Sequence, residues 1–244
     1  MTSAYEKPPE NQPDQQQGSV ESALAGDYDF DIAAIITEAW EKTDGVKWPF
    51  QIALSIYGAV YLLLGIGVPF VLSGFTLEFT QLAEVVGSLL NLAIGYPVMA
   101  GVMMMGLNRA AGRPVYYQMS LQFFAKALPI FILMAVMTIM VSLGLILLII
   151  PGMYLVIAYM FALLLMLDKN MSPWEALETS RKAVTHHWFK IFGIGFVMGL
   201  IMVISILPLG IGLIWTLPMM YIMNGLLYQR IFGVGIDKQT PYLA

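Results

Sequence analysis

Side chains that could do chemistry are scarce in this chain, and its only two histidines, His186 and His187, are adjacent. A histidine pair can bind a metal ion or change its charge near neutral pH. Neighbouring residues on a helix point about 100° apart, because a helix has about 3.6 residues per turn. The two imidazoles therefore cannot bind one ion from one helix face. We predict instead that they lie near a helix C-terminus at the membrane surface, where a positive charge suits the helix dipole.

The rest of the composition excludes several kinds of chemistry. The chain has no cysteine, so disulfides, thiolate metal sites and cysteine nucleophiles are excluded. With only two histidines, most histidine-based metal sites and catalytic triads are excluded as well. We therefore expect no catalytic residue, no resident metal ion and no cofactor. We also expect no nucleic-acid partner, because nucleic-acid binding needs a clustered basic face.

Four further polar residues are candidates for contact with a ligand or a partner. Glu84 lies at the start of an apolar segment and could belong to an outward-facing cation or substrate site, or simply be a solvated loop carboxylate. Asn91 and Asn224 lie within or near apolar segments and could line a solute path, although such amides more often bond across helices. Asp168 lies at the end of another segment. An ionisable group in the middle of a membrane span is usually functional, and no apolar segment here has one.

The elements that must position these residues are apolar segments long enough to cross a membrane. The chain is 59% hydrophobic and only 11% charged, whereas soluble domains carry about 25% charged residues. A membrane helix needs about 20 apolar residues, and six segments approach this length. They cover about 49–73, 85–107, 127–149, 151–167, 190–207 and 209–228. The sequence therefore predicts an all-α, polytopic membrane helix bundle with about six transmembrane helices.

The basic residues predict the orientation of this bundle. All twelve lysines and arginines fall in the two termini or in alternate connections between the apolar segments. Positively charged connections stay in the cytoplasm, so we expect a multi-pass protein of the bacterial inner membrane with both termini cytoplasmic. Residues 1–31 hold seven acids and one base. We expect residues 1–30 to be a disordered acidic tail, residues 31–232 the membrane domain, and residues 233–244 a short C-terminal tail.

Two or three connections have the pattern of amphipathic helices that lie in the membrane interface. Residues 31–43 place apolar side chains at helical spacing after Asp31, a plausible N-cap. Residues 172–188 begin with Ser172, Pro173 and Glu175, which match a capping box with proline at the first helical position. Residues 116–126 are a weaker third example. Such helices bury the apolar face and keep their charges in water.

Gly195 and Gly199 are separated by three residues within one apolar segment. This spacing of small residues often allows two membrane helices to approach closely. We therefore interpret these two glycines as part of a helix packing contact, either a dimer seam or a contact between helices of one chain.

Residues 151–192 resemble a known family over about forty positions. The shared pattern is a Pro-Gly start, an acidic residue, and an Ala-Leu…Ser helix before the next span. It is carried here by Pro151, Gly152, Phe161, Asp168, Ala176, Leu177, Ser180, Arg181 and Trp188. The segment resembles bacterial multipass inner-membrane proteins related to the membrane domain of glycerophosphodiester phosphodiesterases, and YciC-like membrane proteins. The resemblance implies a six-helix membrane module, and we expect no transfer of catalytic activity because the chain has no room for the soluble phosphodiesterase domain.

The favoured interpretation is a non-catalytic inner-membrane protein that acts through lipid or protein contacts, as a membrane scaffold or accessory subunit. The expected partners are membrane lipid and a membrane or cytoplasmic protein. One alternative is a small-solute transporter or channel with a path lined by Asn91 and Asn224. Another is a lipid-modifying membrane enzyme, which would need acids and histidines gathered at one interface. The residues available for that are Asp168, Glu175, Glu178, His186 and His187.

Overall fold

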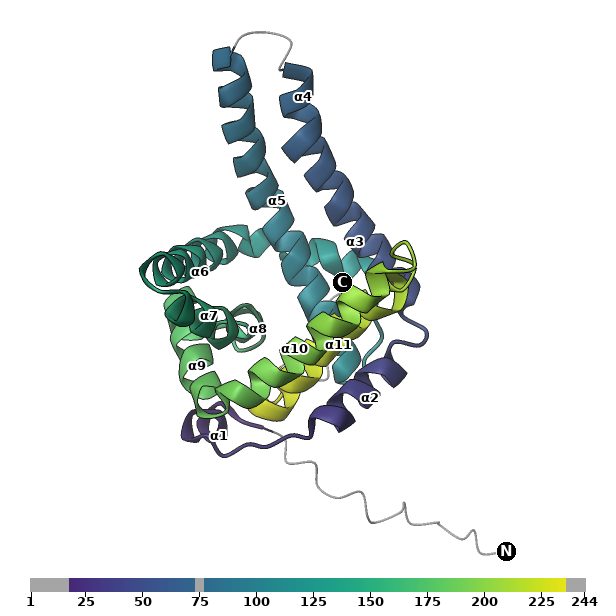
Figure 1. Ribbon diagram of the computed structural model, residues 1–244, viewed down its shortest axis with the longest axis vertical. Coiled ribbons are helices and arrows are strands. Elements are labelled where there is room, and N and C mark those ends of the chain that lie inside the picture. Colours follow the sequence, from purple (N-terminus) through teal and green to yellow (C-terminus); the bar gives the residue numbers. More distant parts are fainter. Residues whose placement is uncertain (1–17, 73–76, 236–244) are drawn as a thin grey trace, which may run out of the picture.

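The computed structural model describes residues 18–72 and 77–235, and over these ranges the chain forms helices and turns without a strand (Figure 1). Five helical stretches in this part of the chain are long and apolar enough to cross a membrane. They are Lys47–Val71, Gln81–Ala110, Tyr117–Leu147, Ile149–Asp168 and Trp188–Ile206. The predicted all-α bundle of a membrane protein is therefore confirmed, and five of the six predicted spans coincide with these stretches.

The sixth predicted span, 209–228, corresponds to the helix α11 (Leu213–Phe232), which differs from the other five. It has the length of a span, but polar residues such as Asn224 and Arg230 interrupt its apolar sequence. Buried residues follow one another along α11 from Thr216 to Phe232, and it packs against α5, α2 and α3. By length and composition, the described chain thus has five candidate spans, and α11 is an additional, mostly buried helix.

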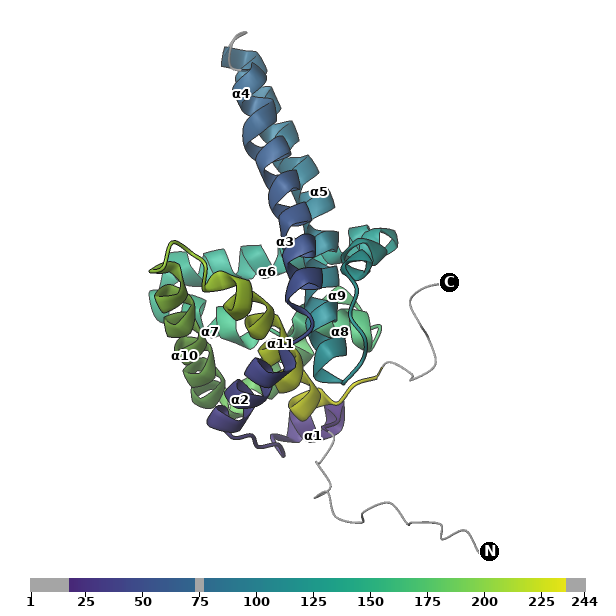
Figure 2. The same ribbon diagram turned by 90° about the vertical axis from the view of Figure 1, so that its right-hand side faces the viewer.

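A long helical hairpin extends beyond the rest of the bundle (Figures 1 and 2). Its first arm is α3 (Lys47–Tyr61), continued by the π-helical turn η1 (Leu62–Gly67) and by α4 (Val68–Leu72). Its second arm is α5 (Leu77–Ala110). Large apolar side chains are exposed on both arms, including Leu63, Ile66, Phe70, Val85 and Leu89. Lipid is the solvent that such a surface requires.

The base of the hairpin crosses α11 at two glycines that allow backbone-to-backbone contact. A Cβ atom placed on Gly225 of α11 would lie 2.6 Å from the carbonyl oxygen of Gly106 on α5 and 2.8 Å from the Cα of Leu107. Gly195 and Gly199 make no close contact between helices of this chain, because nothing lies within 4 Å of a Cβ at either position, and the predicted dimer seam stays a prediction. The close crossing therefore uses a glycine pair on two different helices.

One span is divided into two helices, and a side chain from a neighbouring helix bonds to the backbone at the break. After α6 (Ala127–Leu147), the chain forms α7 (Ile149–Ala158) and α8 (Ala162–Asp168). At the break, Ser180 Oγ donates to the Ala158 carbonyl at 2.7 Å and accepts from the Phe161 N–H at 3.3 Å. A helix break at membrane depth is tolerated when neighbouring helices satisfy its polar backbone.

Ser180 belongs to α9 (Pro173–His186), the most regular of the predicted amphipathic helices. Its predicted Ser172–Glu175 capping box is present, and one face of the helix, formed by Ala176, Leu177, Ser180, Ala183 and Val184, is buried. The predicted helices at residues 31–43 and 116–126 are also present, as α2 (Ile32–Lys42), capped by Asp31, and the 3₁₀ helix η2 (Tyr117–Lys126). Since α9 packs against α6, α7 and α8, it is docked on the bundle.

The predicted disordered tail is wrong for its last thirteen residues. Residues 18–30 form the short helix α1 (Val20–Ala25) and a segment that packs on α9 and α11. Apolar burial explains this order, because Ala23, Tyr28 and Phe30 join the hydrophobic core. Residues 1–17 of the predicted tail and 236–244 of the predicted C-terminal tail lie outside the described residues.

Candidate functional site at the basic end of the bundle

The basic connections predicted to share one side of the membrane are bonded to one another. Lys42 Nζ donates to the Ala110 carbonyl at 2.9 Å, and Arg109 Nε donates to the Lys42 carbonyl at 2.7 Å. Arg230, near the end of α11, forms an ion pair with Glu38 of α2 at 3.2 Å. These bonds join the ends of α2, α5 and α11, and we call this region the basic end of the bundle.

Asp168 lies at this end of the bundle. Its position at the end of a predicted span gave no indication that its side chain is buried. Its side chain has no exposed surface, and Oδ2 accepts hydrogen bonds from Tyr228 Oη at 2.8 Å and from the Gly235 N–H at 2.9 Å. Lys169 Nζ lies 3.6 Å from the same oxygen. The carboxylate therefore attaches the segment after α11 to the end of α8, which is a positioning role within the fold.

The two histidines hold the N-terminal segment. His186 Nε2 lies 3.0 Å from the carbonyl oxygen of Leu24, and His187 Nε2 lies 3.1 Å from that of Gly26. A carbonyl oxygen only accepts, so each Nε2 carries the proton and donates. The pair thus binds two carbonyls of residues 18–31, which we call the N-terminal clasp. Within the described ranges, no group of three or more His, Cys, Asp or Glu side chains could hold a metal ion.

Further contacts attach the N-terminal clasp to α9 and to α10 (Trp188–Ile206). Tyr28 Oη donates to the Ala183 carbonyl at 2.8 Å, and burial raises the pKa of this phenol above its ordinary value. Asp29 forms an ion pair with Lys190, which also lies 4.9 Å from the centre of the Phe30 ring. The hydrogen bond from Lys190 lowers the pKa of Asp29. The clasp is thus fixed by polar, ionic and aromatic contacts together.

Substitution of Gly26 should release the N-terminal clasp. Gly26 has a φ of +75°, and a Cβ there would lie 2.7 Å from Cγ of His186. We expect Gly26→Ala to cost about 1–2 kcal/mol from the left-handed backbone and, in addition, to displace His186. Limited proteolysis or hydrogen exchange should then show faster cleavage or exchange in residues 18–31.

Gly45→Ala is the matched control for this prediction. Gly45 also has a positive φ, +80°, but nothing lies within 4 Å of a Cβ at that position. Its substitution should produce the backbone cost alone and leave the clasp protected. Equal protection of the clasp in both variants would show that the histidine contacts do not hold it.

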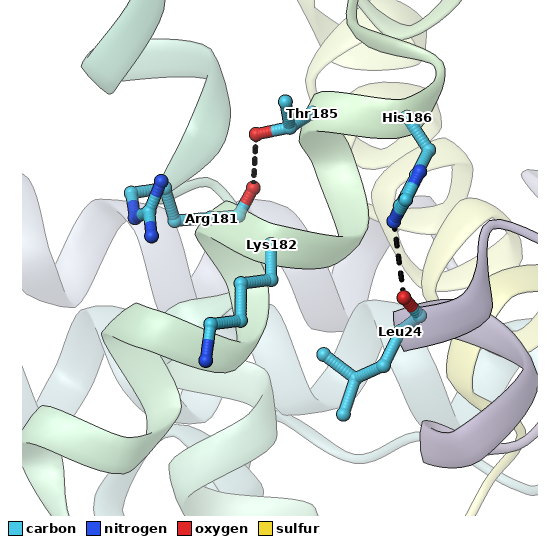
Figure 3. Close-up of a pocket in the computed structure, with 5 residues that line it drawn as sticks. All are labelled: Leu24, Arg181, Lys182, Thr185 and His186. Carbon is cyan, nitrogen blue, oxygen red and sulfur yellow. Dashed lines mark hydrogen bonds between the residues drawn. The ribbon is translucent and has the colours of Figure 1, made fainter.

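An open pocket of about 480 Å³ lies between α1 and α9, lined by Leu24, Arg181, Lys182, Thr185 and His186 (Figure 3). Arg181 donates two hydrogen bonds to Glu178, at 2.9 and 2.7 Å, and Lys182 Nζ lies 3.5 Å from the same carboxylate. The hydrogen bond from Arg181 lowers the pKa of Glu178. Two cations share one carboxylate, so the pocket has an excess of positive charge.

Tyr154 connects this pocket to a row of aromatic rings. Its hydroxyl forms a hydrogen bond with Thr185 Oγ1, and its carbonyl accepts from Trp188 Nε1 at 3.3 Å. The rings of Tyr154, Trp188, Phe192 and Phe196 then stack in sequence, with centroids 6.3, 5.1 and 6.1 Å apart. We call these four residues the aromatic stripe. It runs from the pocket along α10, a candidate membrane span.

The remaining candidates lie elsewhere. Glu84 is exposed on the projecting hairpin. Asn91 lies on α5 beside Gly65 and Gly95, fifteen residues before Gly106 and hence roughly 22 Å from the α11 crossing at a rise of about 1.5 Å per residue. Asn224 adjoins that crossing, so the structure does not bring the two asparagines together.

The acids required for a lipid-modifying site each bond to another group. Asp168 binds Tyr228, Glu175 takes part in the capping box of α9, and Glu178 binds Arg181. Each carboxylate thus has a partner of its own. Sequence reasoning missed Tyr28, Tyr154 and Tyr228, because the residues that they contact are distant in the chain.

The fold and the site together define a polytopic membrane protein with a fixed, basic surface at one end. Comparisons with protein-family models, with curated proteins and with solved structures find no match to this chain. The resemblance in residues 151–192 stays a prediction.

Proposed function

We propose that this protein is a non-catalytic inner-membrane protein of bacteria that acts through lipid or protein contacts at its cytoplasmic side, as a scaffold or accessory subunit. The observation that carries the proposal is the fixed surface at the basic end. There, α9 is docked on the bundle, and the N-terminal clasp is docked on α9. An ordered polar surface beside the membrane, with local positive charge at Arg181 and Lys182, favours contact with anionic headgroups or with an acidic partner.

The cytoplasmic placement of the basic end can be tested directly, because the chain contains no cysteine of its own. Glu41 is exposed at the basic end and Glu84 is exposed on the projecting hairpin. In a bacterial host, Glu84→Cys should react with a membrane-impermeant maleimide in intact spheroplasts. Glu41→Cys should react only in inside-out vesicles, because positive charge is retained in the cytoplasm. The unmodified protein is the blank, and the reverse labelling pattern would show the opposite orientation.

Native mass spectrometry of the gently extracted protein tests the contact function itself. A lipid or a second protein retained at fixed stoichiometry supports the proposal. A bare monomer in several mild detergents contradicts it.

A small-solute transporter is the second candidate, and one observation favours it. Asn224 Oδ1 is buried in α11 and has no hydrogen-bond partner among the described residues. A solute or water path is one way to supply such a partner. Proteoliposome swelling in a series of small neutral solutes tests this candidate, with Asn224→Leu as the variant that should abolish any flux. Equal swelling of proteoliposomes and empty liposomes would exclude it for those solutes.

A further inference from the structure

The pocket between α1 and α9 offers the chemistry that binds a phosphate group. An arginine has five N–H donors, and Glu178 accepts two hydrogen bonds from Arg181. The side chain of Lys182 is more than half exposed, and its Nζ lies 3.5 Å from a carboxylate oxygen of Glu178. Arginine and lysine side chains are the usual partners of phosphate oxygens. A singly charged phosphodiester would neutralise the excess positive charge of the pocket.

The surroundings favour a phosphate that carries acyl chains over a free phosphate ion. The aromatic stripe begins at Tyr154, which is bonded to the pocket residue Thr185. It continues along α10 to Phe196, whose side chain is largely exposed. The Trp188 indole N–H is bonded to a backbone carbonyl, and tryptophan is enriched where membrane helices reach the headgroup layer. A polar, cationic pocket thus continues directly into an exposed apolar surface.

We propose that this pocket binds the headgroup phosphate of an anionic glycerophospholipid, with its acyl chains against the aromatic stripe. Arg181 and Lys182 contact the phosphate, and the rings of Trp188, Phe192 and Phe196 contact the chains. This inference rests on the proposed function, because it names the lipid class and the site of the lipid contact. Leu24 of the N-terminal clasp and His186, which bonds to the Leu24 carbonyl oxygen, both line the pocket. A lipid bound in the pocket would therefore lie next to the clasp.

The test uses the full-length protein, delipidated in a mild detergent and titrated with phosphatidylglycerol or phosphatidylcholine under native mass spectrometry. The unmodified protein should retain one phosphatidylglycerol and show much weaker retention of phosphatidylcholine. Lys182→Gln should weaken phosphatidylglycerol binding about tenfold, the effect of losing one charged hydrogen bond. Lys182 lies on the helix surface with a largely exposed side chain, so this variant should keep the melting temperature of the parent.

Lys47→Gln is the matched control, since Lys47 is another surface lysine and is paired with Asp44 at 2.9 Å. It should leave phosphatidylglycerol binding unchanged. If Lys47→Gln and Lys182→Gln weakened phosphatidylglycerol binding equally, the effect would come from general surface charge, and the proposed site would be overturned.

Two further results separate the lipid from other sources of phosphate and from failure of the proposed function. Phe192→Ala should weaken the binding of long-chain phosphatidylglycerol but not the binding of a dihexanoyl form. Displacement of the lipid by millimolar inorganic phosphate would overturn the lipid assignment. The protein could instead retain a different lipid or a second protein, with binding that Lys182→Gln does not change. That result would overturn this site and leave the proposed function standing. A bare protein under every condition would contradict both.

Discussion

Gly225→Leu should leave little or no folded protein after extraction into detergent. The helices α5 and α11 cross with their backbones in contact, and a Cβ at Gly225 would lie within 2.8 Å of three backbone atoms of Gly106 and Leu107. A backbone cannot rotate away as a side chain can, so the helices must separate. We expect a cost of at least about 3 kcal/mol, the upper end of ordinary overpacking. Fluorescence-detected size-exclusion chromatography and thermal unfolding measure the result.

Gly199→Leu is the control for this crossing. Gly199 also lies in a candidate membrane span, and nothing is within 4 Å of a Cβ placed on it. Its substitution should preserve both the elution profile and the melting temperature. A stable Gly225→Leu variant would mean that α5 and α11 do not cross at this point, whereas a strong loss in Gly199→Leu would assign a packing role to the glycine pair of α10.

Asp168→Ala should produce the second large loss of stability. The substitution removes an acceptor that the Tyr228 hydroxyl and the Gly235 N–H share in a fully buried position. A buried donor without an acceptor costs about 1–3 kcal/mol; Tyr228 is fully buried, whereas Gly235 is exposed and can bond to water, so we expect a loss of about 1–3 kcal/mol. At roughly 2–4 °C per kcal/mol for a chain of this size, the melting temperature should fall by about 2–12 °C.

Two milder variants identify the cause of that loss. Asp168→Asn keeps an acceptor oxygen at the site, and Tyr228→Phe removes a single donor, so each should cost less than Asp168→Ala. In the double variant Asp168→Ala with Tyr228→Phe, the two costs should not add, because both changes remove the same hydrogen bond. Strict additivity would show that Asp168 and Tyr228 act independently.

The membrane architecture was predictable because it depends on local sequence. Hydropathy located all five candidate spans, and Ser172, Pro173 and Glu175 located the start of α9. Hydropathy did not distinguish α11 from a lipid-facing span, because a helix enclosed by protein and a helix enclosed by lipid are both mostly apolar. The spacing of Gly195 and Gly199 also did not reveal that no other helix of this chain lies against them.

The site depended on contacts between residues that are far apart in the chain. Asp168 lies 60 positions from Tyr228, so its sequence neighbourhood gave no sign of burial. The adjacency of His186 and His187 in the sequence gave no sign that His186 bonds to Leu24, 162 positions away. The tail prediction failed because the acidic and polar composition of residues 1–31 concealed two aromatic residues, Tyr28 and Phe30, that reach the core.

The N-terminal clasp also has a consequence for biosynthesis. Its binding surface on α9 is synthesised long after the clasp itself, since 162 positions separate Leu24 from His186. At translation rates of about 5–20 residues per second, the clasp must wait for roughly 10–30 s before its receptor exists. During this interval Tyr28 and Phe30 lack part of the surface that buries them in the complete fold. Docking of the clasp is therefore a late event that needs α9 and then α11, and a nascent chain truncated before α9 would display this segment to chaperones and proteases.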